Sequence, residues 1–193
     1  MLKRLAEEYT AFLQSIPAVK ATKIVGSLEK GTADEYSDID IEVDVSGSDN
    51  GRFLLELPGL LGEKYAIVYY DYAPSLAPEK YVITIALDVK NPFGYVDISC
   101  VATPFHNTVT AEELRSLNNL YDHTLMVFAA NLKHYLRGAE CYGDILKMYG
   151  RIFQKQSDTL SEEAMLKQVY AWLKENGEER HKEYLAGFEN YFL

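Results

Sequence analysis

The sequence predicts an α+β fold, in which a mixed β-sheet with helices is followed by a helical C-terminal region. Two observations carry this prediction. Between residues 22 and 101, short segments rich in valine, isoleucine and tyrosine have the composition and alternation of strands. After Pro104, apolar residues recur at intervals of three and four, as they do in amphipathic helices. We therefore expect an α/β core over residues 1–106 and a helical region over residues 107–193 that packs on it.

The core is expected to begin with a helix over residues 2–16, whose apolar residues have helical spacing, and Pro17 ends it. A second, short helix is expected over residues 52–61, with Pro58 near its end. The predicted strands cover residues 22–25, 38–45, 65–72, 81–89 and 95–101. A turn at Asn91-Pro92-Phe93-Gly94 joins the last two strands.

The C-terminal region carries several helix signals. A capping box at residues 110–113 opens one helix, and a longer helix covers residues 121–137. Either Thr159 or Ser161 caps another helix, which ends at residues 176–177.

Charge and composition limit the class of partner. The chain of 193 residues has 19 basic and 29 acidic residues, a net charge of −10, and no basic run longer than two. A protein that grips a nucleic-acid backbone needs clustered lysine and arginine, so we expect no nucleic-acid partner and favour a small acceptor molecule. No apolar run is long enough to cross a bilayer, and the first eight residues predict an amphipathic helix rather than a signal peptide. With Cys100 and Cys141 as reduced, buried thiols, we expect a cytoplasmic protein.

Residues 38–41 contain a pair of carboxylates that could be catalytic or bind a metal ion. Asp38 and Asp40 alternate with Ile39 and Ile41 on a predicted strand, so both carboxylates point to the same face. Carboxylates about 5 Å apart repel each other by roughly 3 kcal/mol at an effective dielectric constant of about 20. Such a pair persists if it is well solvated, if one carboxylate is protonated, or if a divalent cation such as Mg²⁺ lies between the two. A solvated edge strand is the alternative that needs no function.

The residues before this strand strengthen the functional interpretation. A flexible Gly26-Ser27 turn precedes a polar segment with Lys30-Gly31, and Ser37-Asp38-Ile39-Asp40 follows. This order and spacing resemble the motif of the polymerase-beta-like nucleotidyltransferase superfamily, although Lys30 stands where many members have arginine. The resemblance implies that Gly26, Ser27, Lys30 and Ser37 contact a nucleotide. It also implies that Asp38, Asp40 and a third acidic residue are catalytic and hold Mg²⁺, with two ions expected.

Two aspartates compete for the third position. The Asn-Pro-Phe-Gly turn favours a bulged hairpin in which Asn91 lies opposite Tyr95 and Val89 opposite Asp97, with Asp88 on the other face. In the family that the motif resembles, the third acidic residue lies on a strand beside the Asp-x-Asp strand, in a short apolar context. Residues 95–99 have that context, so we choose Asp97 and interpret Asp88 as a solvated carboxylate.

The resemblance implies transfer of a nucleoside monophosphate, AMP from ATP or the equivalent from another nucleoside triphosphate, to a hydroxyl group. The acceptor expected is a small molecule, and small antibiotic nucleotidyltransferases suggest an aminoglycoside or a lincosamide. Two alternatives remain open: a protein-modifying enzyme of a toxin–antitoxin pair, and a non-catalytic nucleotide-binding scaffold. Residues 136–143 are similar to a short extended segment that returns to the sheet in related proteins. We expect no membrane partner, and residues 191–193 either pack inward or form a homodimer contact.

Overall fold

The computed structural model describes residues 2–73, 80–87, 91–154 and 159–192. The chain forms two compact units, one of Met1–Val89 with Gly94–Asn118 and one of Lys90–Phe93 with Asn119–Leu193.

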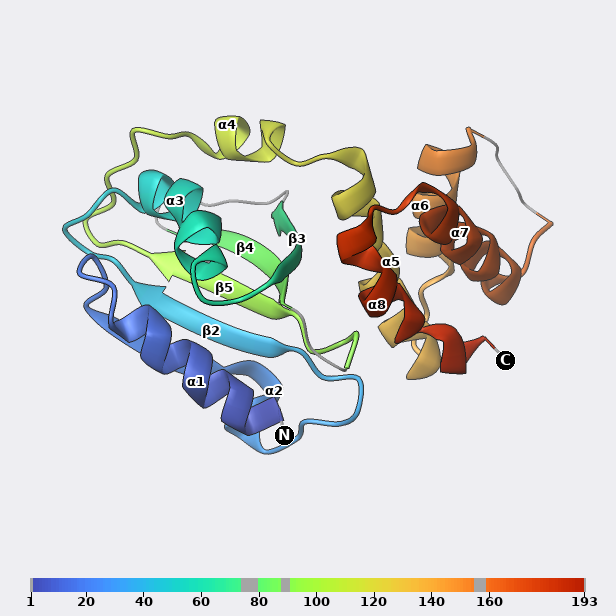
Figure 1. The fold of residues 1–193 in the computed structure, drawn as a ribbon, viewed down its shortest axis with the longest axis horizontal. Coiled ribbons are helices and arrows are strands. Elements are labelled where there is room, and N and C mark those ends of the chain that lie inside the picture. Colours follow the sequence, from blue (N-terminus) through green and yellow to red (C-terminus); the bar gives the residue numbers. More distant parts are fainter. Residues whose placement is uncertain (1, 74–79, 88–90, 155–158, 193) are drawn as a thin grey trace. The chain divides into compact units, whose positions relative to one another are not determined.

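The first unit contains a five-stranded mixed sheet with the strand order β1-β2-β5-β4-β3 (Figure 1). β2 and β5 are parallel, and all other neighbouring strands are antiparallel. The strands are β1 (Ala21–Val25), β2 (Ile39–Asp44), β3 (Ile67–Tyr72), β4 (Lys80–Leu87) and β5 (Val96–Val101). The predicted α+β class and mixed sheet are confirmed, and each strand begins and ends within two residues of its predicted bounds.

One face of this sheet is covered by α1 (Leu2–Gln14) and α3 (Asn50–Gly62), which lie on the same side of it in Figure 1. Both helices contribute to a continuous apolar core that includes Ile39, Ile41 and Val43 of β2, all fully buried. Because side chains alternate along a strand, the residues between them point to the opposite face. The sheet therefore has one apolar face under two helices and one face on which β2 presents acidic side chains.

Two further helices belong to this unit. α2 (Gly26–Lys30) was predicted only as a turn, since five residues are too few to show helical periodicity. α4 (Ala111–Ser116) begins at the predicted capping box, in which Thr110 Oγ1 accepts a hydrogen bond from the Glu113 N–H at 3.2 Å. α4 packs against α3 and β3, so the units divide later in the chain than the predicted boundary at residues 106–107.

The predicted pairing of the last two strands was wrong. Asp97 lies opposite Thr84 of β4, not opposite Val89. Of the residues between these strands, Pro92 and Phe93 group with the helical unit and not with the sheet. Within that unit the Tyr184 hydroxyl donates to the carbonyl oxygen of Pro92. Asp88, the rejected alternative for the third acidic position, lies outside the described residues.

The second unit is helical, as expected. It contains α5 (Leu120–Leu136), α6 (Tyr142–Phe153), α7 (Glu162–Asn176), α8 (Glu179–Ala186) and a short 3₁₀ helix (Glu189–Tyr191). Ser161 rather than Thr159 is the N-cap of α7, and its hydroxyl accepts a hydrogen bond from the Ala164 N–H at 3.2 Å. The expected extended segment at residues 136–143 is wrong, because this stretch is the end of α5, a turn and the start of α6.

Aromatic side chains form much of the core of the helical unit. Phe93 and Phe128 both make edge-to-face contacts with Phe188, with ring centroids 5.7 and 5.3 Å apart. Phe192 stacks on Tyr170 at 5.1 Å, so this part of the C-terminus packs inward, the first of the two alternatives left open. Leu193 lies outside the described residues.

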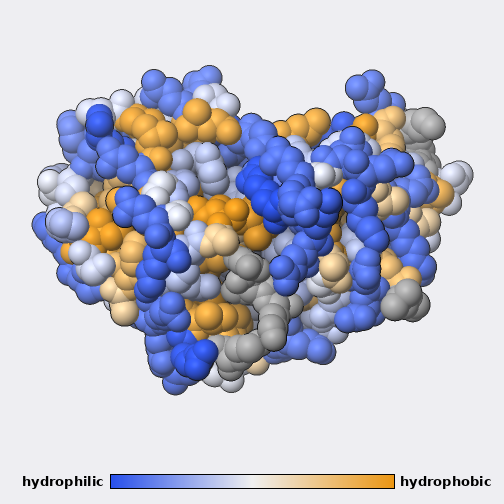
Figure 2. Space-filling view, in the orientation of Figure 1, coloured by the Kyte–Doolittle hydropathy of each residue, from blue (hydrophilic) through white to orange (hydrophobic). Residues whose placement is uncertain are grey.

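Within the described ranges no helix combines the length and the apolar character needed to span a bilayer. Figure 2 shows hydrophilic residues over most of the face it presents, with hydrophobic residues in separate patches.

Candidate functional site

Two of the three predicted aspartates lie side by side on the polar face of the sheet. In the parallel pairing of β2 with β5, Asp40 is directly opposite Asp97. Both side chains are partly exposed, whereas the apolar residues before and after each of them are buried: Ile39 and Ile41 around Asp40, and Val96 and Ile98 around Asp97. Residues in register on adjacent strands have Cβ atoms about 5 Å apart, so one cation could contact both carboxylates.

Asp38 lies one residue before β2 begins. The alternation of buried and partly exposed residues nevertheless extends back to it, since Ser37 is buried, Asp38 is partly exposed and Ile39 is buried. This pattern indicates that Asp38 and Asp40 share the polar face of the chain.

Gly26 places the turn after β1 against the carboxylate of Asp40. Val25 pairs with Asp40 across β1 and β2, and Gly26 follows with a φ of +70°, which disfavours residues with a side chain. A Cβ atom added at Gly26 would lie 1.9 Å from Oδ2 of Asp40. Only glycine therefore allows the turn to approach the aspartate this closely.

The next residue carries a buried polar atom that lacks a partner. Among the described residues, the hydroxyl of Ser27 is one of two buried side-chain polar atoms without a hydrogen bond. An unsatisfied buried hydroxyl costs free energy, so native structures leave few of them. It lies directly after Gly26, next to the aspartate strand, where a phosphate oxygen could supply the missing partner.

The other two predicted nucleotide-binding residues have different surroundings. The buried Ser37 hydroxyl donates to Asp34 Oδ1 at 2.8 Å and accepts from the Asp34 N–H at 2.9 Å. These bonds fix the loop that leads into β2, so Ser37 orders the approach to Asp38. Lys30 is exposed at the end of α2. Contacts of Ser37 and Lys30 with a nucleotide stay predictions.

A residue that sequence reasoning missed also contacts the site. The hydroxyl of Thr84 on β4 donates a hydrogen bond to Oδ1 of Asp97. A threonine in a strand is common, and its importance becomes visible only with the register that places it opposite Asp97.

The donor set fits a cation that is shared with a nucleotide. No group of three or more His, Cys, Asp and Glu side chains in the described ranges is gathered closely enough to hold a metal ion by itself. Mg²⁺, however, is commonly bound through one or two carboxylates together with substrate phosphates and water. Two facing aspartates beside an unsatisfied hydroxyl match that mode, in which the phosphates complete the coordination.

Similarity to known proteins agrees with the motif. Residues 4–89 match the nucleotidyltransferase domain family, and this stretch includes Gly26, Ser27 and both aspartates of the β2 segment. Over this stretch the chain is similar to nucleotidyltransferase domains. The matched stretch ends before Asp97, whose assignment rests on the resemblance and on its pairing with Asp40. No curated protein matches the chain.

Solved structures similar to the chain include the Cid1 poly(U) polymerase, with 18% identity and a TM-score of 0.37. The GLD-2/RNP-8 complex has 12% identity and a TM-score of 0.40, and the polymerase core of TRAMP, an RNA surveillance complex, has 14% and 0.42. The alignments cover 88, 88 and 91% of this chain, but 46, 49 and 58% of those chains. The chain thus spans about half the length of these chains, and similarity at this level does not extend to substrate.

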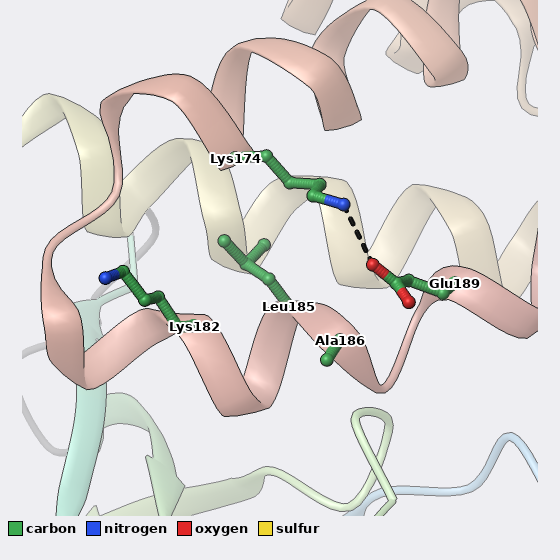
Figure 3. A pocket seen from close by; sticks show the side chains of 5 residues that line it. All are labelled: Lys174, Lys182, Leu185, Ala186 and Glu189. Atoms are coloured by element: carbon green, nitrogen blue, oxygen red, sulfur yellow. Dashed lines mark hydrogen bonds and ion pairs between the residues drawn. The ribbon is translucent and has the colours of Figure 1, made fainter.

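A hollow in the helical unit has different chemistry from the aspartate site (Figure 3). Lys174 and Glu189 bridge it with an ion pair of 2.8 Å, and Leu185 and Ala186 line it. The second lysine of its lining, Lys182, is paired with a glutamate of the same helix. Its positive charges are therefore neutralised by neighbouring carboxylates.

Proposed function

We propose that this protein transfers a nucleoside monophosphate, AMP from ATP, to a hydroxyl group of a small molecule. The observation that carries the proposal is the pairing of Asp40 with Asp97 on the polar face of the sheet, with Gly26 packed against the Asp40 carboxylate. In the reaction, the acceptor oxygen forms a bond to the α-phosphorus, the bond from that phosphorus to pyrophosphate breaks, and the acceptor loses its proton.

The three acidic residues have the following proposed roles in this reaction. Asp38, Asp40 and Asp97 are the proposed acidic ligands of Mg²⁺, of which two ions are expected. The ions, when bound, would neutralise the triphosphate and stabilise the attacking and leaving oxygens. In this proposal Asp97, which pairs with Asp40 on the neighbouring strand, also accepts the proton that the acceptor hydroxyl loses.

The turn after β1 holds the triphosphate in this proposal. The Ser27 hydroxyl donates to a phosphate oxygen and thereby gains the partner that it lacks in the protein alone. Gly26 keeps the backbone close to Asp40, so that the phosphates and the carboxylates meet at one place. Lys30 adds positive charge at the exposed end of α2.

A small-molecule acceptor is favoured by charge. With a net charge of −10, the chain lacks the excess of lysine and arginine that a nucleic-acid backbone requires. The acidic face of β2 continues beyond Asp40 with Glu42 and Asp44, which suits a cationic acceptor such as an aminoglycoside.

The test is an incubation with Mg²⁺ and α-labelled ATP in the presence of separate acceptors. The panel contains aminoglycosides, lincosamides, an RNA oligonucleotide and proteins co-expressed with the chain. Label on an aminoglycoside or a lincosamide supports the proposal. Label on RNA or on a protein contradicts the small-molecule acceptor. If neither label transfer nor pyrophosphate release is seen with any acceptor, transfer to the classes in the panel is contradicted.

A further inference from the structure

Thr84 occupies an unusual position for a polar side chain. It lies in the middle of β4, between Ile83 and Ile85, and is 8% exposed. The side chains two residues away, which share its face of the strand, are Val82 and Ala86. A valine would have nearly the same shape and would avoid burying a hydroxyl. The hydroxyl is therefore expected to have a specific partner.

That partner is Asp97. Thr84 and Asp97 are directly opposite in the antiparallel pair of β4 and β5, and Thr84 Oγ1 donates to Asp97 Oδ1. On its other side β5 pairs with β2, where Asp40 is opposite Asp97. Asp97 thus lies between a hydroxyl donor on one neighbouring strand and a second carboxylate on the other.

This row restricts the orientation of the Asp97 carboxylate. A carboxylate on a strand can rotate about χ1 and χ2, and a hydrogen bond from a rigid, buried, β-branched neighbour selects one orientation. Groups that orient metal-binding carboxylates in this way typically change metal affinity or activity by about 10- to 100-fold when they are removed.

We propose that Thr84 is a positioning residue, which holds the Asp97 carboxylate in the orientation needed to share a divalent cation with Asp40 and the nucleotide. This inference rests on the proposed function. It adds a residue outside the acidic motif and outside the Gly-Ser turn, from a strand that contributes no ligand itself.

The test compares Thr84→Val, which removes the hydroxyl and keeps the shape, with Thr84→Ser, which keeps the hydroxyl. The affinity for Mn²⁺ is measured by electron paramagnetic resonance in the full chain, with a non-hydrolysable ATP analogue present. Thr124→Val is the matched control, because Thr124 is also a buried threonine, and its hydroxyl donates to the Leu120 carbonyl within α5. Urea unfolding of each variant reports stability separately.

We expect Thr84→Val to weaken Mn²⁺ binding by about 10-fold or more. Thr84→Ser should stay close to the wild-type affinity, and Thr124→Val should match the wild type. If Thr84→Val does not fold, Thr84→Ala removes the same hydroxyl with less volume and takes its place. Wild-type Mn²⁺ affinity in the variant without the hydroxyl, or equal weakening in Thr84→Ser, would overturn the positioning role.

Asp97→Asn separates this inference from the function on which it rests. If the wild type binds Mn²⁺ with the nucleotide and Asp97→Asn does not, the proposed site stands, and the Thr84 variants decide the inference alone. If Asp97→Asn binds Mn²⁺ as the wild type does, Asp97 is not a ligand, and the proposed site and the role of Thr84 are both contradicted.

Discussion

The strongest constraint on any single residue of the candidate site acts on Gly26. Its backbone has a φ of +70°, and a Cβ atom would overlap the Asp40 carboxylate. Gly31 has the same φ, but a Cβ atom there would meet nothing within 4 Å. A comparison of alanine substitutions at the two glycines therefore distinguishes the effect of backbone strain from the effect of the close contact with Asp40.

We expect Gly26→Ala and Gly31→Ala each to lose about 1–2 kcal/mol of unfolding free energy, because alanine is strained in the left-handed region. Only Gly26→Ala should also displace the Asp40 carboxylate and lose binding of nucleotide with Mg²⁺. Urea unfolding and calorimetric titration with Mg²⁺ and a non-hydrolysable ATP analogue measure the two effects. Equal nucleotide affinity in both variants would disprove the role given to the Gly26–Asp40 contact.

Removal of the Ser27 hydroxyl is expected to change stability and nucleotide binding in opposite directions. Its hydroxyl is buried without a partner in the protein alone, so Ser27→Ala removes an unsatisfied group. We expect the unfolding free energy of the unliganded variant to stay constant or rise by up to about 1 kcal/mol. Its affinity for the ATP analogue should fall several-fold, as measured by the same titration. A variant that is destabilised but binds the analogue normally would show that the hydroxyl serves the fold and not the ligand.

At the scale of elements, the strands were more predictable than their pairing. The alternation of isoleucine and aspartate in residues 38–41 predicts both the strand and its polar face, because only local chemistry is involved. The choice of Asp97 came from the apolar context of residues 95–99, while the hairpin register used beside it was wrong. Pro92 and Phe93 contact the C-terminal helices, and the turn sequence does not encode such a long-range contact.

Helix α6 was not predicted, although its apolar residues have helical spacing. Tyr142, Ile145, Met148 and Tyr149 recur at helical spacing, and the last three are buried. The five-residue helix α2, in contrast, has too few residues for any periodicity. The sequence could predict the acidic residues of the site, but not Thr84, because its contact with Asp97 exists only through the register of β4 with β5.

The helical unit contains an ionic network between α5 and α8, in which Asp122 and His181 are buried and Arg180 is exposed. Asp122, which is 2% exposed, accepts hydrogen bonds from His181 Nε2 and from Arg180, both at 3.1 Å. The Glu178 N–H donates to Nδ1 of the same histidine at 3.0 Å, so the hydrogen is on Nε2, which donates it in the hydrogen bond to Asp122. Burial would raise the pKa of Asp122, but the bonds from His181 and Asn119 and the charge of Arg180 together hold its pKa below the usual value.

A lowered pKa in the folded state makes this contribution depend on pH. The unfolded chain binds the proton more readily, so the stabilisation is present at neutral pH and is lost as the pH falls below about 4. We expect Asp122→Asn to lose about 1–3 kcal/mol of unfolding free energy at pH 7. The difference from the wild type should shrink as the pH falls from about 5 to 3. Urea unfolding across this range measures it, and a constant difference would show that charge is not responsible.

At the scale of the whole molecule, two compact units divide the chain, and the proposed chemistry lies in the first. The sheet brings residues that are distant in the sequence into one row across β2, β5 and β4, namely Asp40, Asp97 and Thr84. The acidic net charge leaves the triphosphate to be held by cations and a few donors rather than by a basic surface. Nucleotide binding should therefore depend on a divalent ion.

Binding of a non-hydrolysable ATP analogue, measured by calorimetry with and without Mg²⁺, tests this dependence most directly. The wild type should bind the analogue only with Mg²⁺, and Asp40→Asn should bind at least about 10-fold more weakly. The matched control is Asp44→Asn, a change on the same strand at a carboxylate that accepts a hydrogen bond from the Ser46 N–H, and it should bind as the wild type does. Nucleotide binding that needs no Mg²⁺ and is unchanged in Asp40→Asn would contradict the account and leave a nucleotide-binding scaffold.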